Sequence, residues 1–294
     1  MTPDLGQRFI FDGHPVRGQV ACLKDTLRDV FGEHPYPARV AEQLGEALVA
    51  AALLGDTLKF EGSLILQIKG DGPLNTLMVE RDDKGRLRGI ARHDDNDPAL
   101  TRSTGLKSLY GKAYLAISLF PKDGERYQGI VAVEGETLAE VIDGYFDQSE
   151  QLPTRLWLTA DGHQAAGMLL QQLPPNADEE LTEGYWDHLV ALTETIKADE
   201  LKTLDAPEIL HRLYHEETIR LFDGHPLSFH CSCSRERSAR ALISLGKEDV
   251  TALMQEQDVV SVDCQFCGKV YDYDQTDLSW LTSDAPAPGS DQLQ

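Results

Sequence analysis

The stretch CSCSRER at residues 231–237, followed by CQFCG at residues 264–268, decides the organisation of this chain. Four of the five cysteines of the 294 residues lie in these two motifs. One residue separates the first pair and two separate the second, so each pair presents two sulfurs from a single tight turn. Cysteine pairs at such close spacing in a chain expected in the cytosol are more often metal ligands or redox thiols than structural disulfides.

The two cysteine pairs predict a metal centre. Brought together they form a tetrahedral cage of four thiolates, and Zn²⁺ prefers such a closed cage. We therefore predict one zinc ion per chain, held by Cys231, Cys233, Cys264 and Cys267. Gly268 suits the turn that points backbone amides at sulfur. The surrounding segment has fewer than about 60 residues, so the metal would supply much of its folding free energy.

Spacing alone leaves open whether this zinc is a structural clip or a switch. Loss of the metal would leave each cysteine pair able to close locally as a disulfide. Arg235, Arg237 and Lys269 lie within a few residues of the cysteines. Cations stabilise the thiolate, which is the form that peroxide attacks, so these three residues are candidates for tuning the thiolates. The alternative is that they are ordinary solvated charges beside a helix start.

The charge balance bears on partners and compartment. The chain has 49 acidic and 27 basic residues, a formal net charge of −22. Such a surface repels phosphate backbones and anionic membranes, so we expect neither nucleic acid nor membrane as a partner. Residues 1–17 are polar and lack the apolar segment of a signal peptide, and no apolar run is long enough to cross a bilayer. We expect a soluble, cytoplasmic protein.

Residues 1–177 predict an N-terminal α/β domain of the α+β class. Helical periodicity at 37–54 and 137–147 is set among short strand-like segments bounded by glycine, proline and aspartate. Many short strands with few helices between them favour a mostly antiparallel sheet with packed helices. The expected strands are 15–24, 63–69, 76–80, 87–92, 112–119, 129–133, 155–159 and 165–171.

Residues 178–226 predict a helical, acidic linker. Thirteen acidic and four basic residues fall between 178 and 223. Asp205 and Glu208 form a capping box that begins one of its helices. Each helix has one apolar face and few partners within its own segment, so the linker must dock against another part of the chain. Apolar residues on these faces include Trp186, Leu189, Ile196, Leu210 and Leu213.

Residues 227–283 predict a small zinc-binding domain. Strand-like segments at 227–231, 259–263 and 269–273 surround two helical stretches, 236–245 and 248–255. Residues 284–294 are rich in proline, serine and aspartate, and we expect them to be a disordered tail. The fifth cysteine, Cys22, lies in a strand-like stretch and is most simply a small core residue.

The two cysteine motifs resemble the signature of the heat shock protein 33 family, which are redox-regulated holdase chaperones. Four other segments resemble that family too, in the same order along nearly the whole chain. No departure occurs at any of the four cysteines. The further segments are 70–73 (GDGP), 124–129 (GERYQG), 145–155 (YFDQSEQLPTR) and 213–217 (LYHEE).

The resemblance implies a stress-response chaperone and no enzyme. The reduced, zinc-bound form would have little activity. Oxidation with partial unfolding would join Cys231 to Cys233 and Cys264 to Cys267 and release zinc. The linker would then lose order and hold unfolding clients without ATP, and the active form would be a homodimer. The candidate client surface is formed by Trp186, Leu189, Ile196, Leu210 and Leu213.

The residues alone, without the family resemblance, also allow two other functions. The first is a zinc-ribbon binding module, perhaps for nucleic acid, but no basic patch interleaved with aromatics follows residue 227. The second is a thiol oxidoreductase built on Cys264 and Cys267. Such a CxxC motif normally opens a helix in a βαβ unit, whereas here it lies between strand-like segments.

Overall fold

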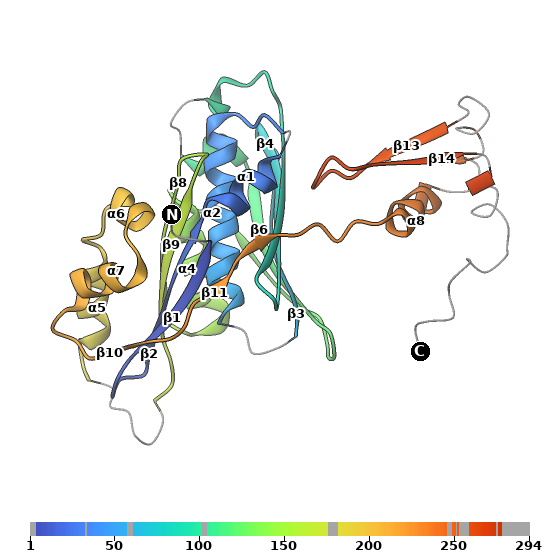
Figure 1. The fold of residues 1–294 in the computed structure, drawn as a ribbon. Coiled ribbons are helices and arrows are strands. Elements are labelled where there is room, and N and C mark those ends of the chain that lie inside the picture. Colours follow the sequence, from blue (N-terminus) through green and yellow to red (C-terminus); the bar gives the residue numbers. More distant parts are fainter. Residues whose placement is uncertain are drawn as a thin grey trace. The chain divides into compact units, whose positions relative to one another are not determined.

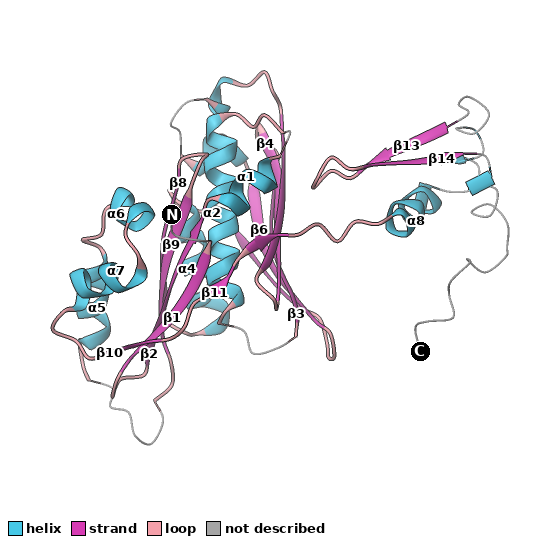
Figure 2. Ribbon diagram, viewed as in Figure 1, coloured by secondary structure: helices cyan, strands magenta, loops and turns pink. Residues whose placement is uncertain are grey.

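The chain forms two compact units, Met1–His230 and Cys231–Gln294, in a computed structural model (Figure 1). The structure describes residues 4–32, 34–57, 61–101, 105–175, 182–245, 249–250, 252, 259–274 and 276–277. Each unit is taken by itself below. Helices and strands are mixed in both units, as the α+β class predicts (Figure 2).

Two mostly antiparallel sheets form the frame of the first unit. The first has the order β10-β1-β2-β9-β8, with β11 also paired to β1. Its strands are β1 (Leu5–Phe11), β2 (Val16–Leu23), β8 (Thr154–Ala160), β9 (Ala165–Gln172), β10 (Ile219–Leu221) and β11 (His225–Pro226). The second has the order β12-β5-β4-β3-β6-β7. Its strands are β3 (Gly62–Gly70), β4 (Leu74–Asp82), β5 (Arg86–His93), β6 (Ala113–Pro121), β7 (Tyr127–Ala132) and β12 (Ser228–Phe229).

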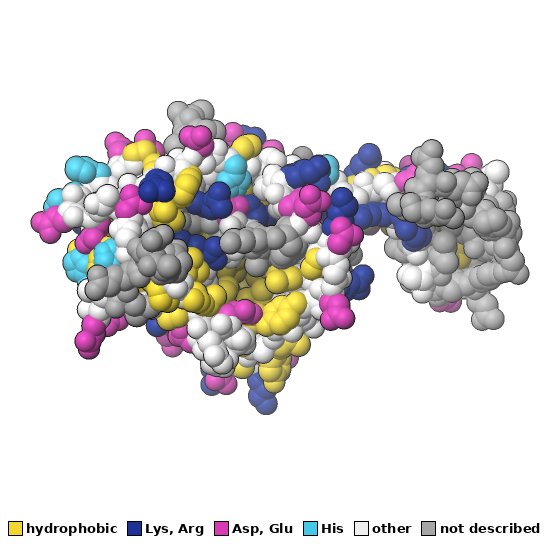
Figure 3. All heavy atoms as spheres, turned by 90° about the horizontal axis from the view of Figure 1, so that it is seen from below, with side chains coloured by type: hydrophobic (Ala, Val, Ile, Leu, Met, Phe, Trp, Pro, Cys, Tyr) yellow, Lys and Arg dark blue, Asp and Glu magenta, His cyan; other side chains and the backbone are white. Residues whose placement is uncertain are grey.

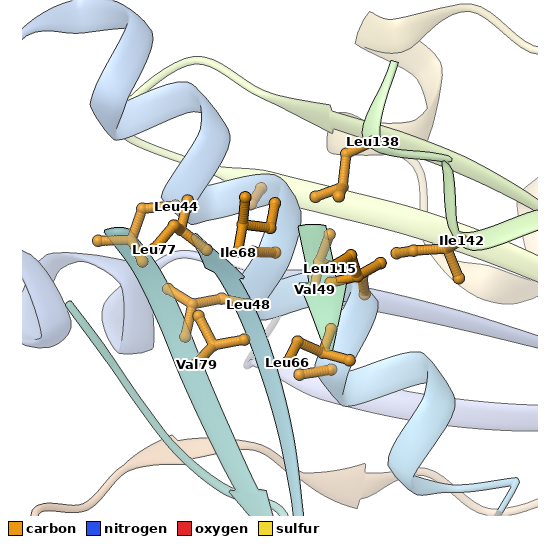
Figure 4. Close-up of a cluster of buried hydrophobic side chains, with 14 of the residues drawn as sticks. Leu44, Leu48, Val49, Leu66, Ile68, Leu77, Val79, Leu115, Leu138 and Ile142 are labelled. Atoms are coloured by element: carbon orange, nitrogen blue, oxygen red, sulfur yellow. The ribbon is translucent and has the colours of Figure 1, made fainter. Parts of the chain in front are cut away.

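The helix α2 (Ala38–Gly55) lies between the two sheets and is apolar nearly all round because both of its sides are covered. In Figure 4 its side chains Leu44, Leu48 and Val49 meet residues of the second sheet such as Leu66 and Leu77. The shorter helices of the frame are α1 (Asp25–Phe31), α3 (Leu106–Tyr110) and α4 (Leu138–Tyr145), with helical turns at Pro98–Leu100 and Phe146–Glu150.

Three linker helices cover the other face of the first sheet: α5 (Tyr185–Thr193), α6 (Ala198–Thr203) and α7 (Ala206–Tyr214). Their apolar residues form a second core with Phe9, Phe11 and Met168 of the sheet. The predicted docking of the linker is therefore confirmed. The capping box is confirmed too, since Asp205 accepts from the Glu208 amide and Glu208 from the Asp205 amide.

The end of the first unit returns across both sheets. After β10 and β11 have paired with β1, β12 pairs parallel to β5. Leu227 is buried in the main core, and the His230 amide donates to the Leu87 carbonyl over 2.9 Å. The compact unit thus extends to His230, four residues beyond the expected boundary before residue 227. The boundaries expected at 178 and 284 fall outside the described residues, and the domain division stays a prediction.

The second unit is a helix packed on a hairpin. The helix α8 (Arg235–Leu245) lies against the antiparallel strands β13 (Val259–Asp263) and β14 (Val270–Asp274). The expected tail, residues 284–294, and most of the expected helix 248–255 lie outside the described residues. None of the described helices in either unit is both long enough and apolar enough to span a membrane.

Candidate metal centre

The four predicted ligand cysteines converge on one point. Their sulfur atoms all lie within 4.8 Å of one another. The sulfurs of Cys231 and Cys264 are 3.6 Å apart and those of Cys233 and Cys267 are 3.5 Å apart. Zinc–sulfur bonds of about 2.3 Å place the sulfurs of a tetrahedral site about 3.8 Å apart. The donor set and its spacing therefore fit a zinc ion.

The local backbone holds the sulfurs in this position. At Gly268 the chain turns with φ of 67°, in the left-handed region that glycine adopts without strain. Its amide donates to the Cys264 carbonyl over 2.7 Å, and the Cys264 amide donates to the Lys269 carbonyl over 2.9 Å. The Lys269 amide points at the sulfur of Cys267, as the sequence predicted, and the Cys233 amide points at that of Cys231.

Tyr271 is a site residue that the sequence analysis missed. Its hydroxyl donates a hydrogen bond to the sulfur of Cys233 over 3.1 Å. The signal was its place two residues after Lys269, on a strand whose alternate residues are buried. Its ring also lies 5.2 Å from the Lys269 ammonium.

The thiols of Cys231, Cys233 and Cys267 differ in pKa because the cage sulfurs share one small space. Burial is the largest cause that raises the pKa of Cys231 and of Cys267, and hydrogen bonds with other thiols add to it. Burial also opposes ionisation of Cys233, but hydrogen bonds from Tyr271 and the neighbouring thiols outweigh it and lower its pKa to about 7. A bound cation would compensate the crowding of thiolates, which is a second reason that these residues fit a metal.

Two of the three cationic candidates have partners other than the sulfurs. The Arg235 guanidinium pairs with Asp277 at 2.5 Å and lies 4.6 Å from the centre of the Tyr273 ring. Arg237 donates to the hydroxyl of Ser232 over 2.6 Å. The pKa shifts of the cysteines are caused by burial, amides, Tyr271 and one another. Thiolate tuning by Arg235, Arg237 and Lys269 stays a prediction.

The apolar core beside the cage is small. Within the described residues it has six buried members, with Cys233, Val262 and Cys264 packed against them. Its buried members are Ala239, Leu242, Val250, Val260, Tyr271 and Tyr273. So few side chains give little hydrophobic stabilisation, and a cross-link through the four cysteines would contribute a large share of the folding free energy.

The predicted client-surface residues are turned inward. Leu189 is 0% exposed, and Leu210 and Leu213 are each 5% exposed. Trp186 and Ile196 are partly buried against the same core between the linker and the first sheet. In this conformation the linker therefore hides the apolar faces. Cys22 packs beside that core, which agrees with its interpretation as a core residue, and burial raises its pKa.

Within the described residues, few polar side-chain contacts tie the linker helices to the first sheet and its turns. The Lys202 ammonium pairs with Asp161 at 2.6 Å, and the imidazole of His14 stacks on the Tyr185 ring at 3.8 Å. The Gln164 side-chain amide donates to the Lys202 carbonyl. Docking therefore depends mainly on apolar burial, which is lost as a whole when the helices detach.

Comparison with known proteins agrees with this arrangement. A sequence family described as Hsp33 protein matches residues 4–274. The 33 kDa chaperonin of Pseudomonas paraeruginosa is 48% identical over 289 residues, covering 97% of each chain. That of Ectopseudomonas mendocina is 49% identical over 294 residues, covering 99% of each.

The fold has a solved counterpart as well. The crystal structure of the 33 kDa chaperonin from Thermotoga maritima superposes with a TM-score of 0.79 at 18% identity, covering 95% of this chain and 98% of that one. This likeness confirms the fold, and the sequence matches establish the relationship. The chain belongs to the Hsp33 family, a family of chaperones and not of enzymes.

Proposed function

We propose that this protein is an ATP-independent holdase chaperone that oxidation switches on. In the reduced form Cys231, Cys233, Cys264 and Cys267 hold one Zn²⁺ and the chain is inactive. Under oxidative stress the thiols form disulfides, the metal leaves and the linker unfolds. The convergence of four sulfurs within 4.8 Å carries this proposal, because it places the stability of the second unit on oxidisable groups.

The redox step needs only a peroxide. A thiolate attacks one peroxide oxygen and becomes a sulfenic acid as the first water leaves. The neighbouring thiolate then attacks the sulfenic sulfur and displaces its hydroxyl as a second water, which gives a disulfide. Each disulfide removes two electrons and two protons from two thiols, and the peroxide leaves as two water molecules. We propose Cys231–Cys233 and Cys264–Cys267 as the pairs. Once the sulfurs are joined they no longer bind the metal, and the small core of the second unit does not hold its fold.

Detached linker helices supply the client surface in this proposal. Leu189, Leu210 and Leu213 would leave the core that they share with the first sheet, and Trp186 and Ile196 would follow. Apolar residues of this kind bind the exposed core segments of unfolding proteins. The acidic residues of the same segment keep the exposed surface from aggregating with itself.

The proposal includes partners and a location. The partners are unfolded proteins and a second copy of the chain in the active state. We propose the cytoplasm as the compartment, since free thiols persist there. The net charge of −22 supports a function without nucleic acid or membrane.

Light scattering from an aggregating client tests the proposal. The protein is compared in its reduced, zinc-loaded form and after peroxide at mild heat, with zinc release followed in the same samples. We expect suppression only after oxidation, together with loss of about one zinc per chain. Oxidised protein that releases zinc but protects no client would contradict the proposal and leave the metal centre as a structural clip.

A matched pair of variants separates the cage from general thiol chemistry. Cys22→Ser removes the cysteine that lies outside the cage, and we expect a normal switch. Cys264→Ser removes one ligand and is expected to weaken zinc binding and to protect clients without peroxide. If both variants switch normally, the four cysteines do not form the switch.

A further inference from the structure

A row of polar side chains crosses the inner face of the first sheet. Arg17 of β2 lies opposite Gln171 of β9, and Gln171 lies opposite Thr154 of β8. Their alternate neighbours Ala21, Leu169 and Leu156 belong to the main core, so the row faces α2 and the second sheet. Gln171 is 1% and Thr154 is 0% exposed. Polar groups in such a place need partners or a ligand.

The row is joined by hydrogen bonds that end at Arg17. The Thr154 hydroxyl donates to the Leu152 carbonyl and accepts from Gln171, each over 2.9 Å. The Gln171 side-chain oxygen then accepts from Arg17 at 3.0 Å and 2.5 Å, and the Thr57 carbonyl accepts from Arg17 at 3.3 Å. Every partner of the guanidinium within the described residues is neutral.

An unpaired cation in this position is unusual for such an acidic chain. The protein has 49 carboxylates in its side chains, yet within the described part of the chain none forms an ion pair with Arg17. The nearby carboxylate of Glu150 is already bound, because it accepts from the hydroxyls of Tyr127 and Tyr145 over 3.0 and 2.8 Å. A half-buried guanidinium without a counter-ion favours an anion from outside.

A cavity of about 160 Å³ opens beside this guanidinium. It lies between the two sheets at the C-terminal end of α2, on the side of the molecule where Figure 3 shows hydrophobic side chains gathered. Its polar lining residues are Arg17, Thr57, Tyr145, Glu150 and Gln171, and the Glu150 carboxylate is held by the hydroxyl of Tyr145. Its apolar walls are Leu54, Leu64, Ile117, Leu119, Phe146 and Leu152. An apolar body with one anionic end would satisfy both parts of this lining.

We propose that the cavity binds a small aliphatic monocarboxylate, with the carboxylate on Arg17 and the alkyl chain between the sheets. Arginine matches a carboxylate with two parallel hydrogen bonds. A dry cavity of about 150 Å³ holds a ligand of roughly benzene size, so a chain of about six carbons fits. The site shares no residue with the cysteine cage or with the linker core, and the proposal stands whether or not the redox switch does.

Calorimetric titration of hexanoate into the reduced full-length chain tests the proposal. We expect saturable binding of one hexanoate per chain. Arg17→Met keeps an apolar stem and removes the cation, so it should weaken the binding of hexanoate by about tenfold or more. Hexan-1-ol has the same chain without the charge, and its affinity should be equal for the wild type and Arg17→Met. That equality also shows that the cavity of the variant is intact.

A second variant tests the apolar walls without touching the polar row. Leu119 is half-buried at the end of β6 and lines the cavity, so Leu119→Trp should fill the space and abolish binding of both probes. Butyrate and decanoate should bind less tightly than hexanoate, because one fills less of the cavity and the other exceeds it. Binding at several sites per chain, equal hexanoate affinity in Arg17→Met, or no saturation with the wild type would each overturn the proposal.

Discussion

The hydroxyl of Tyr271 donates a hydrogen bond to the sulfur of Cys233 across 3.1 Å. Tyr271 is not one of the four cysteines, so its hydroxyl adds a donor to the contacts that the thiols make among themselves. It singles out Cys233, whose pKa is lowered to about 7 although burial opposes its ionisation. The thiolate form of Cys233 is therefore half populated near neutral pH when the cage is empty.

Replacing Tyr271 by phenylalanine should slow the reaction of Cys233 with an alkylating reagent at neutral pH. The donor to the thiolate is lost, so the pKa of Cys233 rises and less thiolate is present. The thiolate that remains is more basic and therefore more nucleophilic. The net decrease in the alkylation rate of Cys233 is therefore about two- to threefold. The rate is measured by pulse labelling of reduced protein directly after a fast chelator removes zinc, before the second unit unfolds, with residue-resolved mass spectrometry.

Tyr273→Phe is the matched control for Tyr271. Its hydroxyl lies on the same strand but donates to the Arg235 carbonyl over 2.6 Å, and no sulfur accepts from it. We expect the alkylation rate of Cys233 to be unchanged in this variant. Equal rates for Tyr271→Phe and Tyr273→Phe would show that the hydroxyl of Tyr271 does not control Cys233.

Truncating Leu213 should loosen the linker without oxidation. Leu213 is 5% exposed in the core that α7 shares with the first sheet. Leucine-to-alanine changes in such cores cost about 2–5 kcal/mol, which is large for helices that have few polar ties to the sheet. Reduced Leu213→Ala should be cleaved faster by protease within α5–α7 and should suppress client aggregation in part.

His211→Ala on the exposed face of the same helix is the control for Leu213→Ala. It removes a side chain of larger size but takes nothing from the core, so the linker should stay docked. Faster cleavage of both variants would indicate a general effect on α7. Unchanged cleavage of Leu213→Ala would mean that apolar burial does not hold the linker.

The sequence predicted most helices and strands because their patterns are local. The 3.6-residue period of α2, the alternation in β3 and the capping box at Asp205 each depend on neighbours along the chain. Which strands pair is a non-local matter, and the sequence analysis expected one sheet where there are two. Strand β1 was missed because residues 5–11 mix polar and apolar residues in a segment that read as polar.

The sequence predicted the ligands of the metal centre but not all of the residues around them. Cysteine spacing is sufficient for the four ligands, and Gly268 marks the turn. Tyr271 was not found because its contact with Cys233 depends on the hairpin register, which pairs Val262 with Tyr271. The apolar faces of Leu189 and Leu210 were correctly expected to need a partner, but the sheet that covers them became known only from the structure.

Neutralising Glu46 should stabilise the protein at high pH. Burial raises the pKa of this α2 carboxyl to about 7. Between about pH 4.5 and about pH 7 the unfolded chain is ionised there while the folded chain keeps its proton, so stability falls as the pH rises through this window. Above it both states are ionised, and the loss is constant at up to about 3 kcal/mol.

Urea unfolding of Glu46→Gln across the same pH window tests this sign. The gain in unfolding free energy over the wild type should be near zero at the acidic end, grow with pH and level off above about pH 7. Glu42 pairs with Arg39 on the same helix, so Glu42→Gln should give no such gain. A gain for Glu46→Gln that does not depend on pH would refute burial of the charge as its cause.

Removing the metal from reduced protein should unfold the second unit and leave the first intact. The small core around Val260 and Tyr273 has little apolar area of its own, whereas α2 and two sheets stabilise the first unit. After treatment with a zinc chelator, amide hydrogens of β13 and β14 should exchange with solvent at near-unfolded rates. The amide hydrogens of β3 and β6 should stay protected from exchange. If those of β13 and β14 also stay protected, the small core of the second unit is sufficient to keep it folded without the metal.

The disulfide pattern after peroxide tests how oxidation and unfolding are coupled. In the folded cage the sulfurs of Cys231 and Cys264 are 3.6 Å apart, and those of Cys233 and Cys267 are 3.5 Å apart. Each of these pairs joins the first cysteine motif to the second. The proposed pairs lie within each motif, so their formation requires the turn at Gly268 and its counterpart to rearrange. Oxidation that yields Cys231–Cys233 and Cys264–Cys267 must therefore proceed with local unfolding.

Mass spectrometry of peptides from oxidised protein distinguishes the patterns, since only the pairing across motifs links two distant peptides. Linked peptides would mean that the cage oxidises without opening, and the linker would then keep its support.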